Sequence, residues 1–449
     1  MTQPHPNASR RDFLRNTAAI GSAVYVGRQV GFAQDGKEKR SANGQVAYAA
    51  IGVDGKGKSD AADAGQRGDM VAICDVDRGK LKRGQKAFKN AKTFEDFREM
   101  LSSMGEEIDA VTVSTPDHMH AVAAAQAMKA GCAVYCQKPL TRTMWEARQL
   151  AEIAAETGVA TQMGNQGTAE TSLRSGAAMV RSGKLGTLKE CHVFTNRPVW
   201  AQGGPRPEPQ EVPANLNWDL WLGTAPERGY ADGYHPFAWR GWWDFGTGAL
   251  GDMACHTFNL PYMALNLRDA ESVQATTSGH NKDSFPQSSK ITFQFGEREG
   301  APAMPVYWYD GGNKPDVALL NGAEFQHASG CIIVGSDMTF YAPGDYGEKW
   351  LLLDENGEEV PKPDDLEYTE SPGHFEEFHQ AITGEGPAAV SNFVDYSGKL
   401  TETILLGNLG VWVDGEKVEF DAANLKVTNM DNEAVNNLIK PEYRGDYSI

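Results

Sequence analysis

Two side chains that can move protons stand four residues apart near the middle of the chain. Asp252 and His256 lie in a glycine-rich segment, and on a helix both would project from one face. A carboxylate one turn from an imidazole can orient the ring and raise its basicity, as a general acid or base requires. The alternatives are a pair that only stabilises a helix and two ligands of a metal site. We predict no metal site.

Aromatic residues and an arginine directly precede this pair. Trp239, Arg240 and Trp243 are predicted to contact a substrate, since indole faces can stack on sugar rings. The alternative for clustered tryptophans is a place in the hydrophobic core.

A lysine and two histidines follow apolar runs in the first third of the chain. Lys138 comes after the run 133–136, and the turn 115–120, which contains His118 and His120, comes after the run 110–114. The carboxyl ends of parallel strands share one edge of a sheet, so both turns should meet at one crevice. Lys138 is the better proton-handling candidate, and its alternative is a solvated loop lysine. The histidines could cap the following helix or pack against a cofactor.

The turn 52–57 resembles a dinucleotide-binding turn. Gly52 and Gly57 fit the first and third glycines of that fingerprint, whereas Asp54 occupies the second place. A carboxylate there repels a diphosphate unless it turns away, so Gly55 could supply the close approach. Asp75 ends the next apolar run, where an acid would bind an adenosine ribose and disfavour a 2′-phosphate. NAD is therefore predicted over NADP, and an ordinary strand-to-helix loop is the alternative.

These residues need a parallel sheet to bring them together. Short apolar runs alternate with helical stretches, which predicts strands connected by crossover helices. The predicted strands are 46–51, 70–74, 110–114, 133–136 and 160–163. The fold class is α/β, with a Rossmann-type doubly wound parallel sheet over residues 46–164.

Residues 165–449 have a different pattern of predicted helices and strands. Helices are predicted at 171–182, 375–382 and 400–410. Apolar runs without crossover helices predict a largely antiparallel open sheet in an α+β domain. The strands are placed at 190–196, 272–277, 290–295, 304–309 and 331–335.

The charge of the chain is unevenly distributed. The whole sequence of 449 residues has a formal charge of −18, whereas residues 1–33 carry +3. Arg10 and Arg11 followed by Phe13 and a weakly apolar stretch resemble a twin-arginine export signal, with a linker at 34–45. We therefore expect export to the periplasm by the twin-arginine machinery. The acidity argues against nucleic-acid binding, and no apolar run is long enough to span a membrane after signal cleavage.

The motifs occur in the order found in the Gfo/Idh/MocA oxidoreductase family, which the chain resembles from about residue 46 onward. The resemblance implies a nicotinamide cofactor on the Rossmann domain and a sugar or polyol substrate. It also implies that Lys138 and His256 are the acid/base candidates, that Asp252 orients the substrate and that the chain forms a homodimer or homotetramer. The predicted cofactor contacts are Gly52, Asp54, Gly55, Gly57, Asp75, Thr115, Pro116, His120, Gln137 and Asn165.

Two departures from the family pattern and the export signal shape the functional hypotheses. Gln137 stands where the family has glutamate, and Asp54 stands where it has glycine. The first hypothesis is an NAD(P)-dependent oxidoreductase that acts on a CH–OH group and holds its cofactor tightly, because free NAD is scarce outside the cytoplasm. The second is a redox-assisted glycoside hydrolase or lyase, and the third is a non-catalytic sugar-binding protein.

Overall fold

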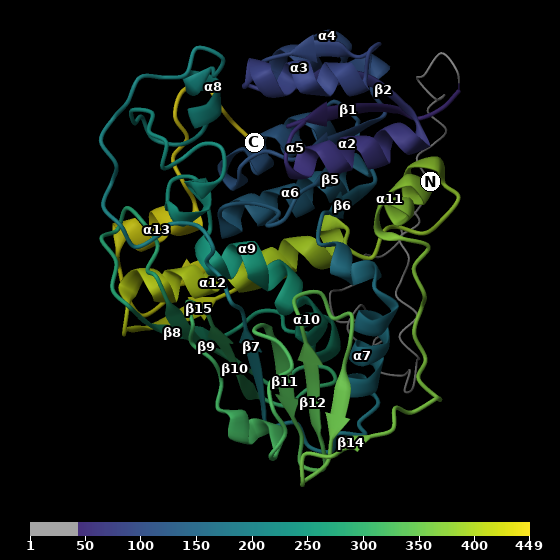
Figure 1. Ribbon diagram of the computed structural model, residues 1–449, viewed down its shortest axis with the longest axis vertical. Helices are drawn as coiled ribbons and strands as arrows, with labels where there is room; N and C mark the ends of the chain where they lie inside the picture. The colour runs from purple at the N-terminus through teal and green to yellow at the C-terminus, as the bar shows by residue number, and fades with distance from the viewer. Residues whose placement is uncertain (1–43) are drawn as a thin grey trace, which may run out of the picture. The chain divides into compact units, whose positions relative to one another are not determined.

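The first domain of the computed structural model contains the predicted parallel sheet (Figure 1). The structure describes residues 44–449, so the predicted export signal and nearly all of the linker lie outside the described residues. The strand order is β3-β2-β1-β4-β5-β6, with every pair parallel. The strands are β1 (Ala47–Ile51), β2 (Asp69–Cys74), β3 (Lys92–Phe94), β4 (Ala110–Val113), β5 (Ala133–Cys136) and β6 (Thr161–Met163). The helices are α2 (Lys56–Arg67), α3 (Arg78–Ala87), α4 (Phe97–Met104), α5 (Asp117–Lys129) and α6 (Met144–Thr157).

Local sequence signals account for the ends of these elements. In α6, Thr143 and Glu146 form a capping box, and Gly158 ends the helix in the left-handed conformation at φ 65°. Strands β1, β4 and β5 are buried along their whole length, as expected for a sheet covered on both faces. The predicted Rossmann-type fold is therefore confirmed.

The second domain has a mixed sheet with the strand order β14-β13-β12-β11-β7-β10-β9-β8-β15-β16. Its strands are β7 (Glu190–Phe194), β8 (Ser272–Thr277), β9 (Ser289–Phe295), β10 (Met304–Tyr309), β11 (Gly330–Val334), β12 (Thr339–Pro343), β13 (Leu351–Leu353), β14 (Glu359–Val360), β15 (Lys417–Asp421) and β16 (Lys426–Val427). Its helices are α7 (Thr171–Arg181), α8 (Trp218–Leu222), α9 (Gly248–Thr257), α10 (Asn259–Leu265), α11 (His374–Thr383), α12 (Gly398–Val413) and α13 (Glu433–Ile439).

The sheet is largely antiparallel, as predicted, but it also contains the strands β12 to β16, which were not predicted, and one parallel pair. Strands β7 and β10 pair in parallel, whereas every other pair of neighbouring strands in this sheet is antiparallel. A parallel pair needs a long connection, and the chain between β7 and β10 includes α8, α9 and α10. That connection begins with a long excursion, residues 195–247, which carries Trp239 and Arg240.

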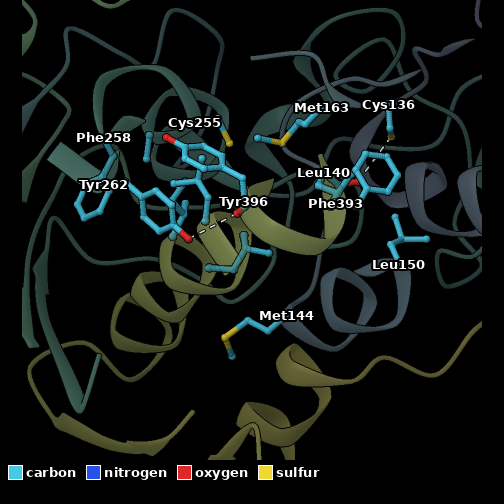
Figure 2. Packing of buried hydrophobic residues seen from close by; sticks show 14 of the residues in the cluster. Cys136, Leu140, Met144, Leu150, Met163, Cys255, Phe258, Tyr262, Phe393 and Tyr396 are labelled. Carbon is cyan, nitrogen blue, oxygen red and sulfur yellow. Dashed lines mark hydrogen bonds between the residues drawn. The ribbon is translucent and has the colours of Figure 1, made fainter. Parts of the chain in front are cut away.

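Helix α12 joins the two domains. It is buried almost throughout and contacts both α6 and the strands β8 and β9. One hydrophobic cluster runs through both domains, so Cys136 and Leu140 of the first share a core with Phe393 of the second (Figure 2). The two domains therefore do not have separate cores along this boundary.

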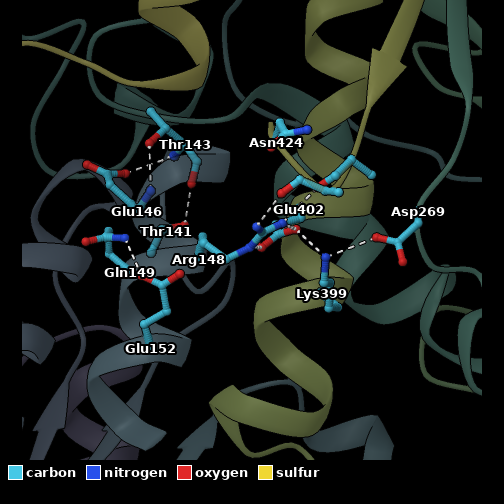
Figure 3. A network of polar contacts seen from close by, with 12 residues as sticks. Thr141, Thr143, Glu146, Arg148, Gln149, Glu152, Asp269, Lys399, Glu402 and Asn424 are labelled. Atoms are coloured by element: carbon cyan, nitrogen blue, oxygen red, sulfur yellow. Dashed lines mark hydrogen bonds and ion pairs between the residues drawn. The ribbon is translucent and has the colours of Figure 1, made fainter. Parts of the chain in front are cut away.

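Charged side chains reinforce the contact between α6 and α12 (Figure 3). Arg148 on α6 binds both oxygens of Glu402 on α12, at 2.6 and 2.7 Å. Lys399 also contacts Glu402, at 3.1 Å, and reaches Asp269 at 3.0 Å. A two-point arginine–carboxylate contact with a buried acid constrains orientation more than a single exposed pair does. It thus helps to hold α12 of the second domain against α6 of the first.

The six cysteines are buried and free of disulfides, in line with the expectation that they are small core residues. Among residues 44–449 no helix has the length and apolar character needed to cross a membrane.

Candidate active site

A cavity of about 780 Å³ lies at the carboxyl ends of the first-domain strands. Its walls come from the turns after β1, β2, β4 and β5, from the excursion and from the C-terminal segment. This is where open parallel sheets bind their ligands. Of the predicted residues, those on its lining are Gly52, Asp54, Gly55, Asp75, Thr115, Pro116, Gln137, Lys138, Trp239 and Arg240.

The turn after β1 needs its glycines. Gly52 has φ +83°, and a Cβ there would lie 2.4 Å from the carbonyl oxygen of Ser114. A Cβ on Gly57 would lie 2.2 Å from the carbonyl oxygen of Gly52. Gly55, at φ +57°, faces open space, and no side chain caps the start of α2. The turn and the uncapped amides of α2 therefore fit the diphosphate of a dinucleotide.

The charge of Asp54 is balanced by a neighbour. Its Oδ2 accepts a hydrogen bond from Nη2 of Arg83 on α3 at 2.7 Å. This bond holds the pKa of Asp54 below its ordinary value, so the carboxylate stays ionised and paired. The Arg83 pair reduces the repulsion that Asp54 would exert on a diphosphate.

Asp75 lies at the predicted ribose position. Its Oδ2 accepts from the amide of Val53 at 3.2 Å, and its Oδ1 accepts from the amide of Asp77 at 3.0 Å. Burial raises the pKa of Asp75, and the two amides oppose that effect. The carboxylate thus joins the turns after β1 and β2 while remaining on the cavity lining.

Lys138, Asp252 and Arg240 form a charged cluster at one wall. Nζ of Lys138 donates to Oδ1 of Asp252 at 3.0 Å and to its carbonyl oxygen at 2.8 Å. Nε of Arg240 donates to the same Oδ1 at 3.0 Å. Burial disfavours the carboxylate, but the charges of Lys138 and Arg240 outweigh burial and lower the pKa of Asp252 to about 2. Asp252 is therefore an anion that holds two cations at the cavity.

Asp117, which was not among the predicted site residues, also lines this wall. It is the first residue of α5, is buried, and accepts a hydrogen bond from Oγ1 of Thr247 at 2.8 Å. Burial raises its pKa to about 7, although the charge of Arg240 opposes the shift. Its place directly after Thr115 and Pro116 was the sequence signal that could have identified it.

Gln137 has a partner that explains why it is not a glutamate here. Its Nε2 donates to Oδ2 of Asp60 at 2.9 Å, and Asp60 is fully buried. Ser114 donates to the same oxygen at 2.7 Å, and Lys56 pairs with Oδ1 at 2.6 Å. A glutamate at position 137 would put a second carboxylate against Asp60. Asp60 was not predicted, because nothing local indicates its partner.

His256 lies one turn from Asp252 on α9 but is not its hydrogen-bond partner. The ring is buried against Tyr346, with 4.7 Å between centroids, and Nδ1 has no partner in the described part of the chain. Burial, and next the charge of Lys138, hold the pKa of His256 well below its ordinary value, so the imidazole is neutral. Asp252 bonds to Lys138 and Arg240 instead. The prediction that Asp252 orients the ring of His256 is therefore wrong.

Several predicted contacts lie behind the cavity wall. His120 sits between the carbonyl oxygens of Thr115 and Pro139, at 2.8 Å from each, and so ties the two turns together. Asn165 is fully buried and bonds to Ser391. Neither residue is on the cavity lining, and their contact with a cofactor remains a prediction.

The aromatic residues divide between the cavity and the core. Trp239 lines the cavity and lies under the guanidinium of Arg240, at 4.2 Å from the ring centroid. Trp243 instead stacks on Phe285 in the core, with 3.7 Å between centroids. This placement favours the core alternative for Trp243.

No group of three or more His, Cys, Asp or Glu side chains in residues 44–449 is arranged to hold a metal ion. His118 is occupied elsewhere, because its ring nitrogens lie 2.9 Å from the carbonyl oxygen of Trp221 and 3.2 Å from that of Phe245. These contacts fasten α5 to the excursion.

Two family models match the chain. Residues 46–165 match the Gfo/Idh/MocA model described as an oxidoreductase family with an NAD-binding Rossmann fold. Residues 177–449 match the model of the C-terminal alpha/beta domain of that oxidoreductase family.

Curated relatives match in part. The chain is 29% identical over 119 residues to a D-apiose dehydrogenase of Paraburkholderia graminis, covering 26% of the chain and 31% of the relative. It is 30% identical over 90 residues to a D-glucoside 3-dehydrogenase of Escherichia coli, covering 20% and 25%. The matches thus span about a quarter to a third of the length of these relatives.

Solved structures share the fold over most of the chain. The WlbA dehydrogenase of Bordetella pertussis, in complex with NADH and UDP-GlcNAcA, has a TM-score of 0.59 at 17% identity and covers 84% of this chain and 99% of its own. An inositol dehydrogenase homolog of Azotobacter vinelandii, with NADH and myo-inositol, has a TM-score of 0.55 at 16% identity and covers 85% and 99%.

Proposed function

Because the chain belongs to the Gfo/Idh/MocA oxidoreductase family, we propose that it oxidises or reduces one carbon of a sugar, glycoside or polyol with NAD. The observation that carries the proposal is that Lys138 and Arg240 line the same cavity as the glycine turn and are both held by the buried Asp252. The names of the relatives, which include sugar dehydrogenases, support the substrate class.

The charged cluster suits proton transfer at a hydroxyl carbon. A nicotinamide bound in the cavity supplies the acceptor or donor for hydride. When a carbonyl is reduced, the Lys138 ammonium gives a proton to its oxygen, and when an alcohol is oxidised, the Lys138 amine takes the hydroxyl proton. Asp252 holds Nζ in place for either direction, and Arg240 can donate to a neighbouring hydroxyl. Neutral His256 is the second acid/base candidate, and it is buried behind the cavity lining.

The preference for NAD over NADP rests on charge. Asp75, Asp77, Glu95 and Asp96 all line the cavity on the side of β2 and β3. Four carboxylates outnumber the two cations of α3 on this side of the cavity, Lys80 and Arg83, and Arg83 is already paired with Asp54. Identification by mass spectrometry of the cofactor released from the protein checks this preference.

The decisive experiment combines substrate screening with a Lys138→Ala variant. The protein is incubated with NAD and a panel of polyols and glycosides, and both reduced cofactor and products are measured. Lys138→Ala should lower turnover at least about 100-fold while leaving bound cofactor unchanged, because it removes the proton carrier. Lys129→Ala, which changes an exposed lysine of α5, is the matched control.

The outcomes separate the hypotheses. Net reduction of NAD with an oxidised sugar supports the dehydrogenase, and cleavage of a glycoside without net reduction supports the redox-assisted hydrolase or lyase. Activity of Lys138→Ala within a few-fold of the unaltered protein would remove Lys138 from the mechanism. A protein that binds sugars and no NAD would be a sugar-binding protein instead.

Export and assembly are part of the proposal. We propose that the residues 1–33 direct the folded protein through the twin-arginine route with its cofactor bound. A homodimer or homotetramer would use the outer face of the large sheet, where Tyr307 and Tyr309 are half-buried beside exposed Lys290. Sedimentation analysis of the unaltered protein checks the assembly, since a monomer would contradict it.

A further inference from the structure

The end of the chain reaches the cavity. After α13 the C-terminal segment, residues 440–449, passes α8 and arrives at the first domain (Figure 1). Tyr447 is 9% exposed and lines the cavity together with Phe97 and Leu220. A residue more than 300 positions away from the Rossmann turns therefore forms part of the same wall.

Two arginines hold this segment in place. Arg444 donates to the carboxylate and the carbonyl oxygen of Asp219 on α8, at 2.7 Å each, and to the carbonyl oxygen of Gly223 at 3.2 Å. Arg98 on α4 pairs with Asp446 at 2.9 Å and lies 4.5 Å from the ring centroid of Tyr447. The segment thus bridges an element of the second domain and an element of the first.

A third contact lies just before these two. The hydroxyl of Tyr443 donates to Oε1 of Glu146 on α6 at 2.8 Å. Glu146 is buried and also caps its own helix through Thr143. The contacts at Tyr443, Arg444 and Arg98 fix the path of the chain up to the cavity.

The position of Tyr447 along the cavity indicates which part of a dinucleotide it meets. Asp75 at the end of β2 marks the ribose of the adenosine. Strand β3 lies beyond β2 in the sheet, and the residues that follow it, Glu95 to Phe97, line the cavity with Tyr447. The wall of Phe97, Leu220 and Tyr447 is therefore on the adenosine side, and aromatic faces stack on nucleobases.

We propose that Tyr447 is an adenosine-binding residue and that residues 443–449 form a strap that must leave its place before the cofactor is released. The inference rests on the proposed use of NAD. It gives a physical reason for retention of the cofactor, because release requires that the contacts of Tyr443, Arg444 and Arg98 break together.

The test measures nucleotide release and needs no substrate. The full chain is loaded with NADH and mixed with excess NAD, and the loss of bound NADH fluorescence gives the dissociation rate. Tyr447→Ala should release NADH at least about tenfold faster, and Tyr447→Phe should stay within about threefold of the unaltered protein, because it keeps the ring. Tyr368→Ala, at an exposed tyrosine, is the matched control.

A second variant and a second readout keep the test decisive. A chain without residues 446–449 should show the same fast release, and a melting curve without nucleotide confirms that each variant folds. Bound NADH should slow amide hydrogen exchange in residues 443–449 of the unaltered protein. Release within twofold of the unaltered protein in either folded variant, or no protection of the strap, overturns the inference. If the unaltered protein binds no NADH, the proposed function itself fails.

Discussion

Asp252 accepts hydrogen bonds from two cations and thereby sets the charge of the candidate site. Lys138 and Arg240 both bond to one of its oxygens, and its pKa of about 2 keeps it ionised under all physiological conditions. The three residues carry a net positive charge, which favours an oxygen that gains negative charge during reaction. Asp117 adds a fourth titratable group to this wall.

Asp117→Asn tests the burial of that fourth group. An acid with a folded pKa of about 7 and an ordinary pKa of 3.8 binds a proton in the folded state that the unfolded state has lost. Stability should therefore fall as pH rises between about 4 and 7, by up to about 1.4 kcal/mol per pH unit, relative to the variant. Unfolding curves of both proteins across this pH range measure the change in stability. A stability difference between the two proteins that does not change with pH would mean that Asp117 is ionised throughout.

At the scale of elements, β1, the turn after it and α2 pack so closely that backbone atoms contact one another without side chains between them. The Cβ positions of Gly52 and Gly57 are taken by the carbonyl oxygens of Ser114 and Gly52. Asp60 on α2 then bonds to Ser114 and Gln137, which belong to the turns after β4 and β5. One helix thus sets the relative positions of three turns on the cavity.

Gly57→Ala should disturb this unit. The added methyl group meets backbone atoms, which cannot move aside as a side chain can, so we expect a loss of about 1–3 kcal/mol in stability. The affinity for NADH should fall at least about tenfold, because the amides of α2 shift. Titration of NADH fluorescence and thermal unfolding measure both effects. Gly204→Ala, at a glycine with open space around it, should change neither.

At the scale of the whole molecule, three regions distant in the sequence enclose the cavity. They are the first-domain turns, the excursion between β7 and β8, and the C-terminal strap. The two domains that carry the first two regions are joined by the shared core and by the pair of Arg148 and Glu402. A cavity whose walls come from three such regions suits a cofactor that travels with the folded protein and is not exchanged.

Replacing Arg10 and Arg11 by lysine tests the export proposal. The twin-arginine route recognises the arginine pair, so the double variant should accumulate in the cytoplasm of a bacterial host while keeping its fold and its NADH affinity. Immunoblots of cytoplasmic and periplasmic fractions measure the distribution. An unchanged distribution would show that residues 1–33 do not act through this pair, and an Arg67→Lys variant controls for expression.

The sequence by itself determined those features of the fold and the site that depend on residues close together in the chain. The glycine turn, the parallel strands of the first domain other than β3, and the grouping of Lys138 with Asp75 at one sheet edge follow from local periodicity and from the rule for parallel sheets. Strand β3 has only three residues and was not predicted. In the second sheet the strands β7 to β11 were predicted, whereas β12 to β16 were not. The parallel pairing of β7 and β10 was not predicted either, because strand partners far apart in the sequence leave no periodic signal.

Only the tertiary structure decided which distant groups meet. It bonds Asp252 to Lys138 rather than to His256, buries Asp117 and Asp60, moves Trp243 into the core and brings Tyr447 to the cavity. These outcomes depend on desolvation and on contacts between residues that are, in most cases, more than 100 positions apart. Residue type and local spacing indicate neither the desolvation nor the contacts. The sequence therefore identifies which residues can transfer protons or bind a dinucleotide. The packing of the two domains decides which of them contact one another at the cavity.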